Sequence, residues 1–544
     1  MPLLAQCHIP IPTKDILSFC YENRHTYDQD KPIYIDTATN ESISANQAYG
    51  YIRKLIAGWR AIGLKKGDCV CIHSFNHLFY PILVQSIIGA GGIFLGTNPS
   101  YTSYELEHAL KTSKTKFLIA APDLLSAPKT AAKTIGIPDS NILLFSDSNH
   151  TNHKSWQTLL THGSEDWISF DDEWTSKNTA AFLMFSSGTT GLPKAAQVSH
   201  HNLIAQHTLV HENPSHPTPF PLSSLQSLPF FHAAAAPYTH VSTLRSGYPS
   251  HIMRRFEPWA YLDAVAKYQT TRIMVVPPMV IALLECARLD SALVRRSLSS
   301  VQQAVAGAAP LSAETQARLQ TLLPPTTPFT QLWAMTETAC IASYFYPPLN
   351  DATGSVGTFL PNLDVKLVDV DDPDLEVGPY DTRGEICIRG PTVVRGYLDN
   401  PAANAESWDA EGYFHTGDIA VCEGRTGLWY IVDRKKELIK VRGFQCAPAE
   451  IEGVLLQHPG VADVAVIGVD GGASGEVPRA FVVRRGGVDV SEESVKGWVK
   501  ERLAGYKQLE GGVRFVEGIP KNASGKILKR VLREGVKREG GVKL

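Results

Sequence analysis

The chain has 544 residues, of which 44% are hydrophobic, and 51 Lys and Arg stand against 54 Asp and Glu. This length indicates about three or four structural units, and the near-neutral charge gives no electrostatic reason to expect nucleic acid or an anionic membrane surface as the main partner. No apolar run approaches the roughly 20 residues of a membrane helix, and the N-terminus lacks a secretory pattern. We expect a cytoplasmic protein, with its odd number of nine cysteines reduced.

The first part of the chain, residues 30–180, alternates between helix-like and strand-like periods, which is typical of α/β folds with parallel strands. A second stretch of this kind spans residues 225–345. The expected helices are 52–62, 78–90, a helix from Thr102 to Leu110 that opens on a capping box, and 279–288. The expected strands are 69–73, 92–96, 117–120 and 272–278.

Residues 364–430 change to short strands with turns, such as 365–368 and 384–389, which indicates a small distorted β-barrel. After residue 433 the composition becomes rich in Gly, Lys and Arg, with strands expected at 464–467 and 480–483 and a helix at 491–503. The predicted fold class is therefore α/β. We expect a large N-terminal domain, 1–433, made of two α/β subdomains plus the barrel, and a small α+β domain, 434–544, on a charged hinge.

The segment Phe185-Ser-Ser-Gly-Thr-Thr-Gly-Leu-Pro-Lys194 combines flexible glycines and hydroxyl groups with a terminal lysine. Such a loop presents backbone N–H groups, hydroxyls and a cation to a phosphate. The residues that would bind ATP in this way are Ser186, Ser187, Gly188, Thr189, Thr190, Gly191 and Lys194. The loop is not a Walker motif, because Pro193 precedes the lysine and no hydroxyl residue follows it. It resembles the signature loop of the adenylate-forming superfamily, which includes acyl-CoA synthetases, 4-coumarate–CoA ligases, luciferases and peptide-synthetase adenylation domains.

Further segments resemble the same superfamily in its order, so that the resemblance covers nearly the whole chain. Gln331-Leu-Trp-Ala-Met-Thr-Glu337 is similar to the segment that binds ATP beside the signature loop. The resemblance implies that Trp333 lies against adenine, with Gln331 in the same site. It also implies that Thr336 contacts the α-phosphate and that Glu337 holds magnesium.

Two later segments complete the nucleotide site implied by the resemblance. Tyr413-Phe-His-Thr-Gly-Asp418 is similar to the turn whose carboxylate, here Asp418, binds both ribose hydroxyls, and Arg434 takes the place of an arginine on ribose and phosphate. Lys436 takes the place of the hinge pivot. The contacts implied around it are AMP contacts by Lys440 and Gln445 and coenzyme A contacts by Arg255, Arg442 and Gly443.

The remaining motifs concern the binding of the acid and the catalysis of the reaction. Pro520-Lys-Asn-Ala-Ser-Gly-Lys526 resembles the loop that delivers the adenylation lysine, here Lys526, whose cation would stabilise the charge that develops at phosphorus. His232 resembles the wall between acyl pocket and coenzyme A tunnel. The implied acyl pocket consists of Ala234, Tyr238, Gly307, Ala308 and Leu332. Because Leu332 replaces a glycine and Ala234 replaces a phenol-binding tyrosine, we expect a displaced, apolar pocket.

The resemblance implies an ATP- and Mg²⁺-dependent ligase that joins an aryl or medium-chain carboxylic acid to coenzyme A through an acyl-AMP, in specialised metabolism. A downstream synthase or acyltransferase would be a further partner. The alternatives are an acyl-AMP ligase that loads a separate carrier protein, a luciferase-like oxidase, and an inactive binding protein, which the retained Lys194, Glu337 and Lys526 disfavour. The C-terminal Val542-Lys-Leu544 keeps two residues of a peroxisomal signal, which gives an alternative to the cytoplasm.

Overall fold

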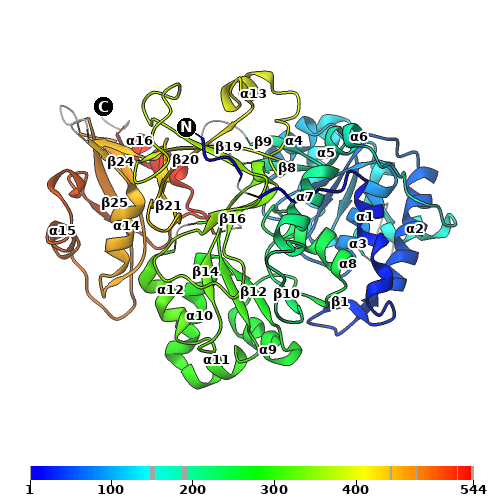
Figure 1. The fold of residues 1–544 in the computed structure, drawn as a ribbon, viewed down its shortest axis with the longest axis horizontal. Helices are drawn as coiled ribbons and strands as arrows, with labels where there is room; N and C mark the ends of the chain where they lie inside the picture. The colour runs from blue at the N-terminus through cyan, green and yellow to red at the C-terminus, as the bar shows by residue number, and fades with distance from the viewer. Residues whose placement is uncertain are drawn as a thin grey trace.

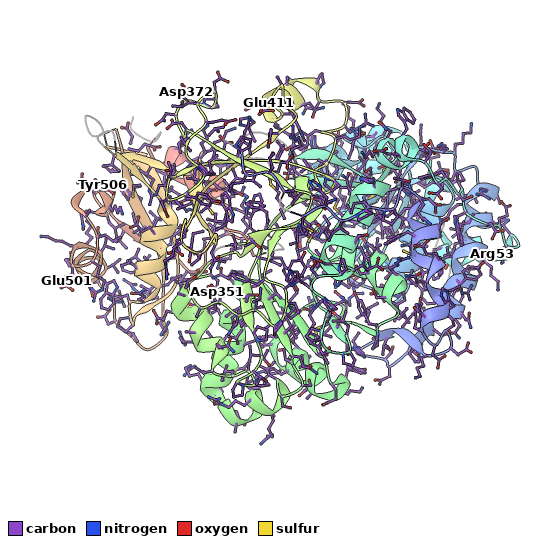
Figure 2. All side chains as sticks on the ribbon, in the orientation of Figure 1. Arg53, Asp351, Asp372, Glu411, Glu501 and Tyr506 are labelled. Atoms are coloured by element: carbon purple, nitrogen blue, oxygen red, sulfur yellow. The ribbon has the colours of Figure 1, made fainter. Side chains whose placement is uncertain are left out.

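The computed structural model describes residues 2–5, 7–146, 153–186, 193–309, 311–441, 444–471, 475–522 and 525–540. Two seven-stranded sheets make up most of the molecule, and several smaller sheets adjoin them. Figure 1 shows the first α/β unit at the right, in blue and cyan, and the C-terminal unit at the left, in orange. The charged side chains of Arg53, Glu411 and Glu501 lie at the rim (Figure 2), as solvation of charge requires.

The first large sheet has the strand order β7-β6-β5-β3-β4-β8-β9 and is parallel except for the β8–β9 pair. Helices cover its faces, so its central strands are continuous apolar runs, and β3 is buried at every position. The strands are β3 Cys69–His73, β4 Ile93–Gly96, β5 Thr115–Ala120, β6 Ile142–Leu144, β7 Lys154–Ser155, β8 Ala180–Ser186 and β9 Lys194–Ser199. The helices of this unit are α2 Ala45–Ala61, α3 Tyr80–Gly89, α4 Ser103–Thr112, α5 Ser126–Ile135 and α6 Glu173–Asn178.

The second large sheet has the order β14-β13-β12-β10-β11-β1-β2 and is parallel except for β1–β2. Its strands are β1 Pro32–Asp36, β2 Ser42–Ser44, β10 Ser224–Gln226, β11 Ser250–Ile252, β12 Arg272–Val275, β13 Gln303–Ala306 and β14 Phe329–Gln331. Its helices, at the bottom of Figure 1, are α9 Pro258–Tyr268, α10 Pro277–Leu289, α11 Ser291–Ser297 and α12 Ala313–Gln320.

Helix α7, His200–His211, lies at the centre of the molecule between the two large sheets (Figure 1). Every residue of α7 before His211 is buried, because both sheets cover it. It packs with α1, Ile16–Glu22, and with the short helical turns before α8, Thr243–Ser246. One hydrophobic core extends from this contact through both α/β units.

Smaller antiparallel sheets follow the second α/β unit. They are formed by β15 Trp333–Met335, β16 Cys340–Tyr344 and β17 Thr358–Phe359, and by β18 Asp364–Val368, β19 Gly384–Arg389, β20 Phe414–Cys422 and β21 Trp429–Arg434. Helix α13, Pro401–Ser407, precedes β20. These sheets share a second hydrophobic core, which contains Tyr238, Trp333 and Val365.

The C-terminal unit has a hydrophobic core of its own, with Ile451, Val466 and Val482 at its centre. Its elements are β22 Ile439–Val441, β23 Phe444–Cys446, α14 Pro448–Leu456, β24 Val461–Asp470, β25 Glu476–Arg484, α15 Glu492–Lys500, β26 Val513–Phe515 and α16 Lys529–Gly540. An independent core of this kind is what a mobile domain needs. The boundary at residue 433 stays a prediction.

The sequence predictions agree with this architecture, and the α/β fold class is confirmed. The predicted capping box is present, because Thr102 accepts from the N–H of Glu105 while the Glu105 carboxylate accepts from Thr102. Several boundaries differ, among them two helix starts: α2 begins at a second capping box on Ser44, and α10 begins at Pro277, a residue type favoured in the first turn. Ile62, the last residue of the helix expected at 52–62, caps α2 and is exposed. All nine cysteines are free thiols, as expected. None of the helices within the described ranges is long and apolar enough to cross a membrane.

Candidate functional site

The predicted phosphate loop connects two strands at the edge of the first sheet. Ser186 ends β8, Lys194 begins β9, and the two residues are direct cross-strand partners. This pairing brings the ends of the loop together and fixes the lysine at its base. Residues 187–192, which include the predicted Ser187, Gly188, Thr189, Thr190 and Gly191, lie outside the described residues.

The Lys194 ammonium group faces the ring of Tyr397 at 5.0 Å from its centroid. The Tyr397 hydroxyl in turn donates a hydrogen bond of 2.7 Å to Oε1 of Glu337, which is buried. Tyr397 reaches this place because its segment pairs with β9, through a bridge between Ala196 and Tyr397. The tyrosine therefore joins the predicted phosphate cation to the predicted magnesium ligand.

Asp418 is held by a hydrogen bond and an ion pair from different elements. Its Oδ2 accepts from the indole Nε1 of Trp333 at 2.8 Å, and its Oδ1 lies 3.1 Å from Nε of Arg434. Asp418 and Arg434 face each other across β20 and β21. The carboxylate raises the pKa of Arg434 above its usual value. A carboxylate offers about four acceptor positions, so two remain beside these donors for two hydroxyl groups of a ligand.

Lys526 of the C-terminal unit reaches the same group of side chains. Burial and the positive charge of Arg434 lower its pKa to about 8, although the carboxylates of Glu437, Asp418 and Glu337 oppose this. The backbone before it packs closely, since a Cβ at Gly525 would lie 2.7 Å from Cδ of Pro278. The lysine is therefore influenced by carboxylates of both units and by the guanidinium group at their boundary.

A short loop fixes the position of Lys526. Its N–H donates to the side chain of Asn522 at 2.8 Å, and its carbonyl accepts from the N–H of Asn522 at 2.9 Å. Behind the loop, the buried Lys529 forms ion pairs with Glu437 at 3.4 Å and Glu452 at 3.0 Å. These charges tie the lysine loop to the segment between the two units.

The predicted hinge begins where β21 ends. The buried Asp433 carboxylate accepts from the N–H of Ala449 in the C-terminal unit, and burial raises its pKa to about 6. Lys436 follows in an exposed turn, with its ammonium group 3.6 Å from Glu406. Lys435 is anchored instead, through its N–H to the carbonyl of Gly417 and its ammonium group to Glu385.

His232 lies near Lys526 at the entrance of the second unit. Its Nδ1 accepts from the N–H of Ala234 at 3.1 Å, and its pKa is lowered to about 4 by burial and by the charge of Lys526. The ring is therefore neutral at ordinary pH.

The remaining predicted residues are placed differently. Gln331 is buried, and its amide is occupied by backbone groups of Leu311 and by Gln316. Thr336 begins the turn that carries Glu337. Arg255 is exposed in the bend after β11. Lys440 and Gln445 lie in β22 and β23, where their side chains are outside the described part, and Arg442 and Gly443 lie outside the described residues.

The backbone near the site adopts strained conformations. Ala308, Ala339 and Cys340 have φ values of 71°, 53° and 120°, which residues with a side chain rarely adopt. Strain of this kind tends to gather at ligand sites. The turns it occupies follow β13 and precede β16.

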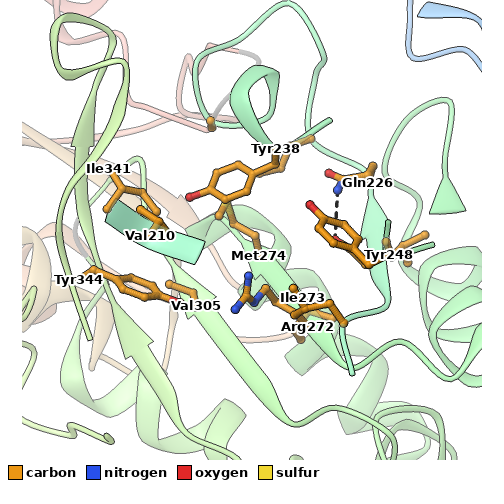
Figure 3. Close-up of a pocket in the computed structure, with 15 residues that line it drawn as sticks. Val210, Gln226, Tyr238, Tyr248, Arg272, Ile273, Met274, Val305, Ile341 and Tyr344 are labelled. Carbon is orange, nitrogen blue, oxygen red and sulfur yellow. Dashed lines mark hydrogen bonds between the residues drawn. The ribbon is translucent and has the colours of Figure 1, made fainter. Parts of the chain in front are cut away.

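A narrow cavity with a volume of about 30 Å³ lies between α7, the second large sheet and β16 (Figure 3). Ala234 and Tyr238 line it, as expected of the acyl pocket. Leu332 packs closely against Gly307. A Cβ atom added to that glycine would lie only 2.6 Å from Cδ1 of Leu332. Most of the lining is apolar, and Arg272 also lines the cavity.

Comparisons with known proteins agree with this geometry. The model of the AMP-binding enzyme family matches residues 21–398, and that of the AMP-binding enzyme C-terminal domain matches residues 450–526. The chain belongs to this family. The predicted adenylate-forming superfamily, in its acyl-CoA synthetase branch, is thereby confirmed.

Its relatives include two proteins of Aspergillus niger. One is named phenylacetyl-CoA ligase epaB and is 50% identical over 533 residues. The alignment covers 97% of this chain and 97% of the relative. The other is named acyl-CoA ligase azaF and is 50% identical over 531 residues. That alignment covers 96% of this chain and 98% of the relative. ATP-bound MatB from Rhodopseudomonas palustris has a similar structure, with a TM-score of 0.83, 26% identity, and coverage of 96% of this chain and 99% of that one. The prediction that the chain is an enzyme of the acid–CoA ligase class is confirmed by these relatives.

Sequence reasoning missed Tyr397 and Arg272. Tyr397 follows Gly396, whose φ of 149° marks a special backbone position, but its pairing with β9 had no local signal. Arg272 opens a strand that was predicted correctly, and a charged residue at the start of a buried strand was the signal that could have found it.

Proposed function

We propose that the chain joins a carboxylic acid to coenzyme A in two steps, with ATP as the energy source. In the first step the carboxylate attacks the α-phosphorus of ATP, which forms an acyl-adenylate and releases pyrophosphate. In the second step the coenzyme A thiolate attacks the acyl carbon, and AMP leaves. The acid we expect is an aryl or medium-chain acid, in keeping with relatives named phenylacetyl-CoA and acyl-CoA ligases.

One observation supports the first step: the charges of Asp418 and Glu337 of the large unit, and of Arg434 at the boundary, all act on Lys526 of the C-terminal unit. A phosphoryl transition state needs cations placed beforehand where negative charge develops. We assign Lys526 to the α-phosphate, and Asp418, with Arg434 beside it, to the ribose. Trp333 packs at the same carboxylate, where its indole would lie against the base.

We assign Lys194 and the signature loop to the outer phosphates. Glu337 would hold magnesium, and its geometry fits this role, because Tyr397 occupies Oε1 and a hard cation needs only one or two protein carboxylates beside phosphate oxygens and water. The ion would neutralise phosphate charge. Tyr397 keeps the carboxylate oriented, and its ring holds the Lys194 ammonium group next to it.

For the second step we propose that Lys526 moves away, because its charge acts on His232, the residue assigned to the wall between the acid and the incoming thiol. We propose that the C-terminal unit turns about Lys436, whose side chain is exposed in the turn after β21. Lys440, Gln445, Arg442 and Gly443 would then face the site, and Arg255 would contact coenzyme A. The neutral His232 would form the wall between the acid and the incoming thiol.

The test is a pair of assays on the full chain with ATP, Mg²⁺ and a panel of carboxylic acids. Acid-dependent exchange of pyrophosphate into ATP reports the first step, and acyl-CoA formation on addition of coenzyme A reports the second. Exchange without any acyl-CoA would favour an acyl-AMP ligase that serves a carrier protein. Light or acid-dependent oxygen uptake would favour an oxidase, and the absence of exchange with every acid would contradict the proposed function.

A further inference from the structure

The cavity proposed to hold the acyl group is lined by a positive charge that has no counter-charge among the described residues. Arg272 is only 9% exposed, and Figure 3 shows its guanidinium group pointing into the cavity between Met274 and Val305. Its Nε donates to Oε1 of Gln303 at 2.7 Å, and its Nη1 donates to Nδ1 of His211 at 3.3 Å. Both partners are neutral, since burial and the nearby charge lower the pKa of His211 well below its usual value.

Other buried cations of this chain are paired with carboxylates. Arg245 is 7% exposed, and its guanidinium group binds both Glu22 and Glu212. Lys366 is 9% exposed and forms ion pairs with Asp409 and Glu411. In the part of the chain that the structure describes, no carboxylate forms an ion pair with Arg272. A buried charge without a partner is costly, so this arrangement favours a negative group supplied by a ligand.

The groups around Arg272 are donors as well. Gln303 gives its oxygen to Arg272 and its Nε2 to the hydroxyl oxygen of Tyr344 at 2.7 Å, which leaves the Tyr344 proton free to donate. The hydroxyl of Tyr238 is also buried, and its neighbour is the thiol of Cys340, a weak hydrogen-bonding group. Both tyrosines line the cavity together with Arg272. This end of the cavity therefore offers a cation and two O–H groups, which suits a ligand group that can accept several hydrogen bonds.

We propose that the acid activated by this enzyme carries a second carboxylate at its far end, bound by Arg272 with help from Tyr344 and Tyr238. This rests on the proposed function, because the reacting carboxylate would lie at the other end of the cavity, at Ala234 beside His232. Arg272 and Met274 lie two residues apart on one face of β12. Met274 is a flexible side chain that can move to admit a longer acid. Arg272 is thus a specificity-determining residue for the far end of the substrate.

The test compares acids in matched pairs that differ only in the far carboxylate: hexanoate with adipate, octanoate with suberate, and phenylacetate with 4-carboxyphenylacetate. Acid-dependent pyrophosphate exchange gives kcat/KM for each. In the wild-type chain we expect the diacid of at least one pair to be preferred by about 10-fold or more, since a site built for an ionic group rejects the analogue without it.

Arg272→Met should reverse this preference, with a loss for the diacid and a gain for the monoacid. Arg288→Met is the matched control, because Arg288 is exposed on α10 and pairs only with Glu285 at 2.9 Å. Gln303→Glu is the second variant. It keeps Arg272 but places a carboxylate against it, so the diacid preference should also be lost, and this variant decides the matter if Arg272→Met fails to fold.

A wild-type chain that prefers the monoacid of every pair would overturn the proposal, as would a preference unchanged in both variants. Preference for phenylacetate over its carboxylated partner would mean that the guanidinium group lies against an aromatic face instead. Failure of the proposed function is distinct from these results, because then neither member of any pair would support exchange.

Discussion

The nucleotide side and the acid side of the site are built in different ways. On the proposed nucleotide side, Lys194 begins a strand, and Glu337, Asp418 and Lys526 each belong to a short turn or loop segment. On the acid side, Arg272, His211 and Tyr344 come from β12, α7 and β16, with no local motif around any of them. Phosphate chemistry is the same for every acid, whereas the cavity must fit one acid. The difference indicates that short local motifs determine the type of reaction, whereas the packing of segments that are distant in the chain determines which acid is bound.

The largest effect should come from removing the cation on the nucleotide side. Lys526→Ala should lower acyl-adenylate formation by about 10²–10³-fold, as for the loss of one group that stabilises transition-state charge. Thioester formation from a preformed acyl-adenylate should change little, because that step involves no phosphoryl transfer. Single-turnover rates of the two half-reactions provide the measurement, and equal losses in both would contradict the assignment.

The hinge should separate the two half-reactions in the opposite direction. Lys436→Pro should leave adenylation within a few-fold and lower thioester formation by about 10-fold or more, because proline restricts the rotation of residue 436 and of the residue before it. Lys435→Pro is the contrasting variant, since it removes the hydrogen bond to Gly417 that holds the turn in place. If Lys436→Pro transfers the acyl group to coenzyme A at the wild-type rate, the domain does not turn there.

Tyr397 links Lys194, the predicted phosphate-binding cation, to Glu337, the predicted magnesium ligand. Tyr397→Phe keeps the ring beside Lys194 but removes the hydroxyl from Glu337, and a hydrogen bond to a charged group is worth about 1.5–3 kcal/mol. The Mg²⁺ concentration for half-maximal activity should therefore rise about 10-fold. Tyr34→Phe, which removes a buried hydrogen bond to Thr239 in another part of the fold, should leave it unchanged.

The pKa of Lys526 predicts a pH dependence. Burial lowers it to about 8, so the lysine is charged below pH 8 and loses its proton above it. Since kcat/KM reports the free enzyme, kcat/KM for ATP should fall as the pH rises through about 8. Lys526→Arg should move this fall to higher pH, because a guanidinium group keeps its proton. An unchanged alkaline fall in the arginine variant would assign it to another group.

The smallest effect is expected on the acid side, at Leu332. Leu332→Gly removes the side chain that packs on Gly307 and so should open room next to the cavity. In a hydrophobic pocket such a change is worth about 1–3 kcal/mol of discrimination. Activity toward longer arylpropenoic acids should rise relative to wild type, measured as kcat/KM by pyrophosphate exchange. An unchanged acid profile would separate Leu332 from the pocket.

The same contrast explains what the sequence could predict. The buried strand at Cys69–His73 and the capping box at Thr102 depend on neighbours in the chain, and so do the motifs that ended in Asp418 and Lys526. The hydrogen bond from Trp333 to Asp418 spans 85 residues, and the pairing of Tyr397 with β9 spans about 200, so neither had a local signal. Leu332 was assigned to the pocket by resemblance at one position, and its contact with Gly307, another residue predicted for the pocket, leaves that assignment a prediction.

The central claim is that side chains from both units and from the acyl cavity meet on one acyl-adenylate. A crystal structure of the chain with ATP and the preferred acid, or with a non-hydrolysable acyl-adenylate analogue, tests it most directly. The account predicts the ribose hydroxyls on Asp418, the Lys526 ammonium group within hydrogen-bonding distance of the α-phosphate, and the far end of the acid at Arg272. A nucleotide bound away from Asp418, or an acyl group that leaves the cavity at Arg272 empty, would contradict it.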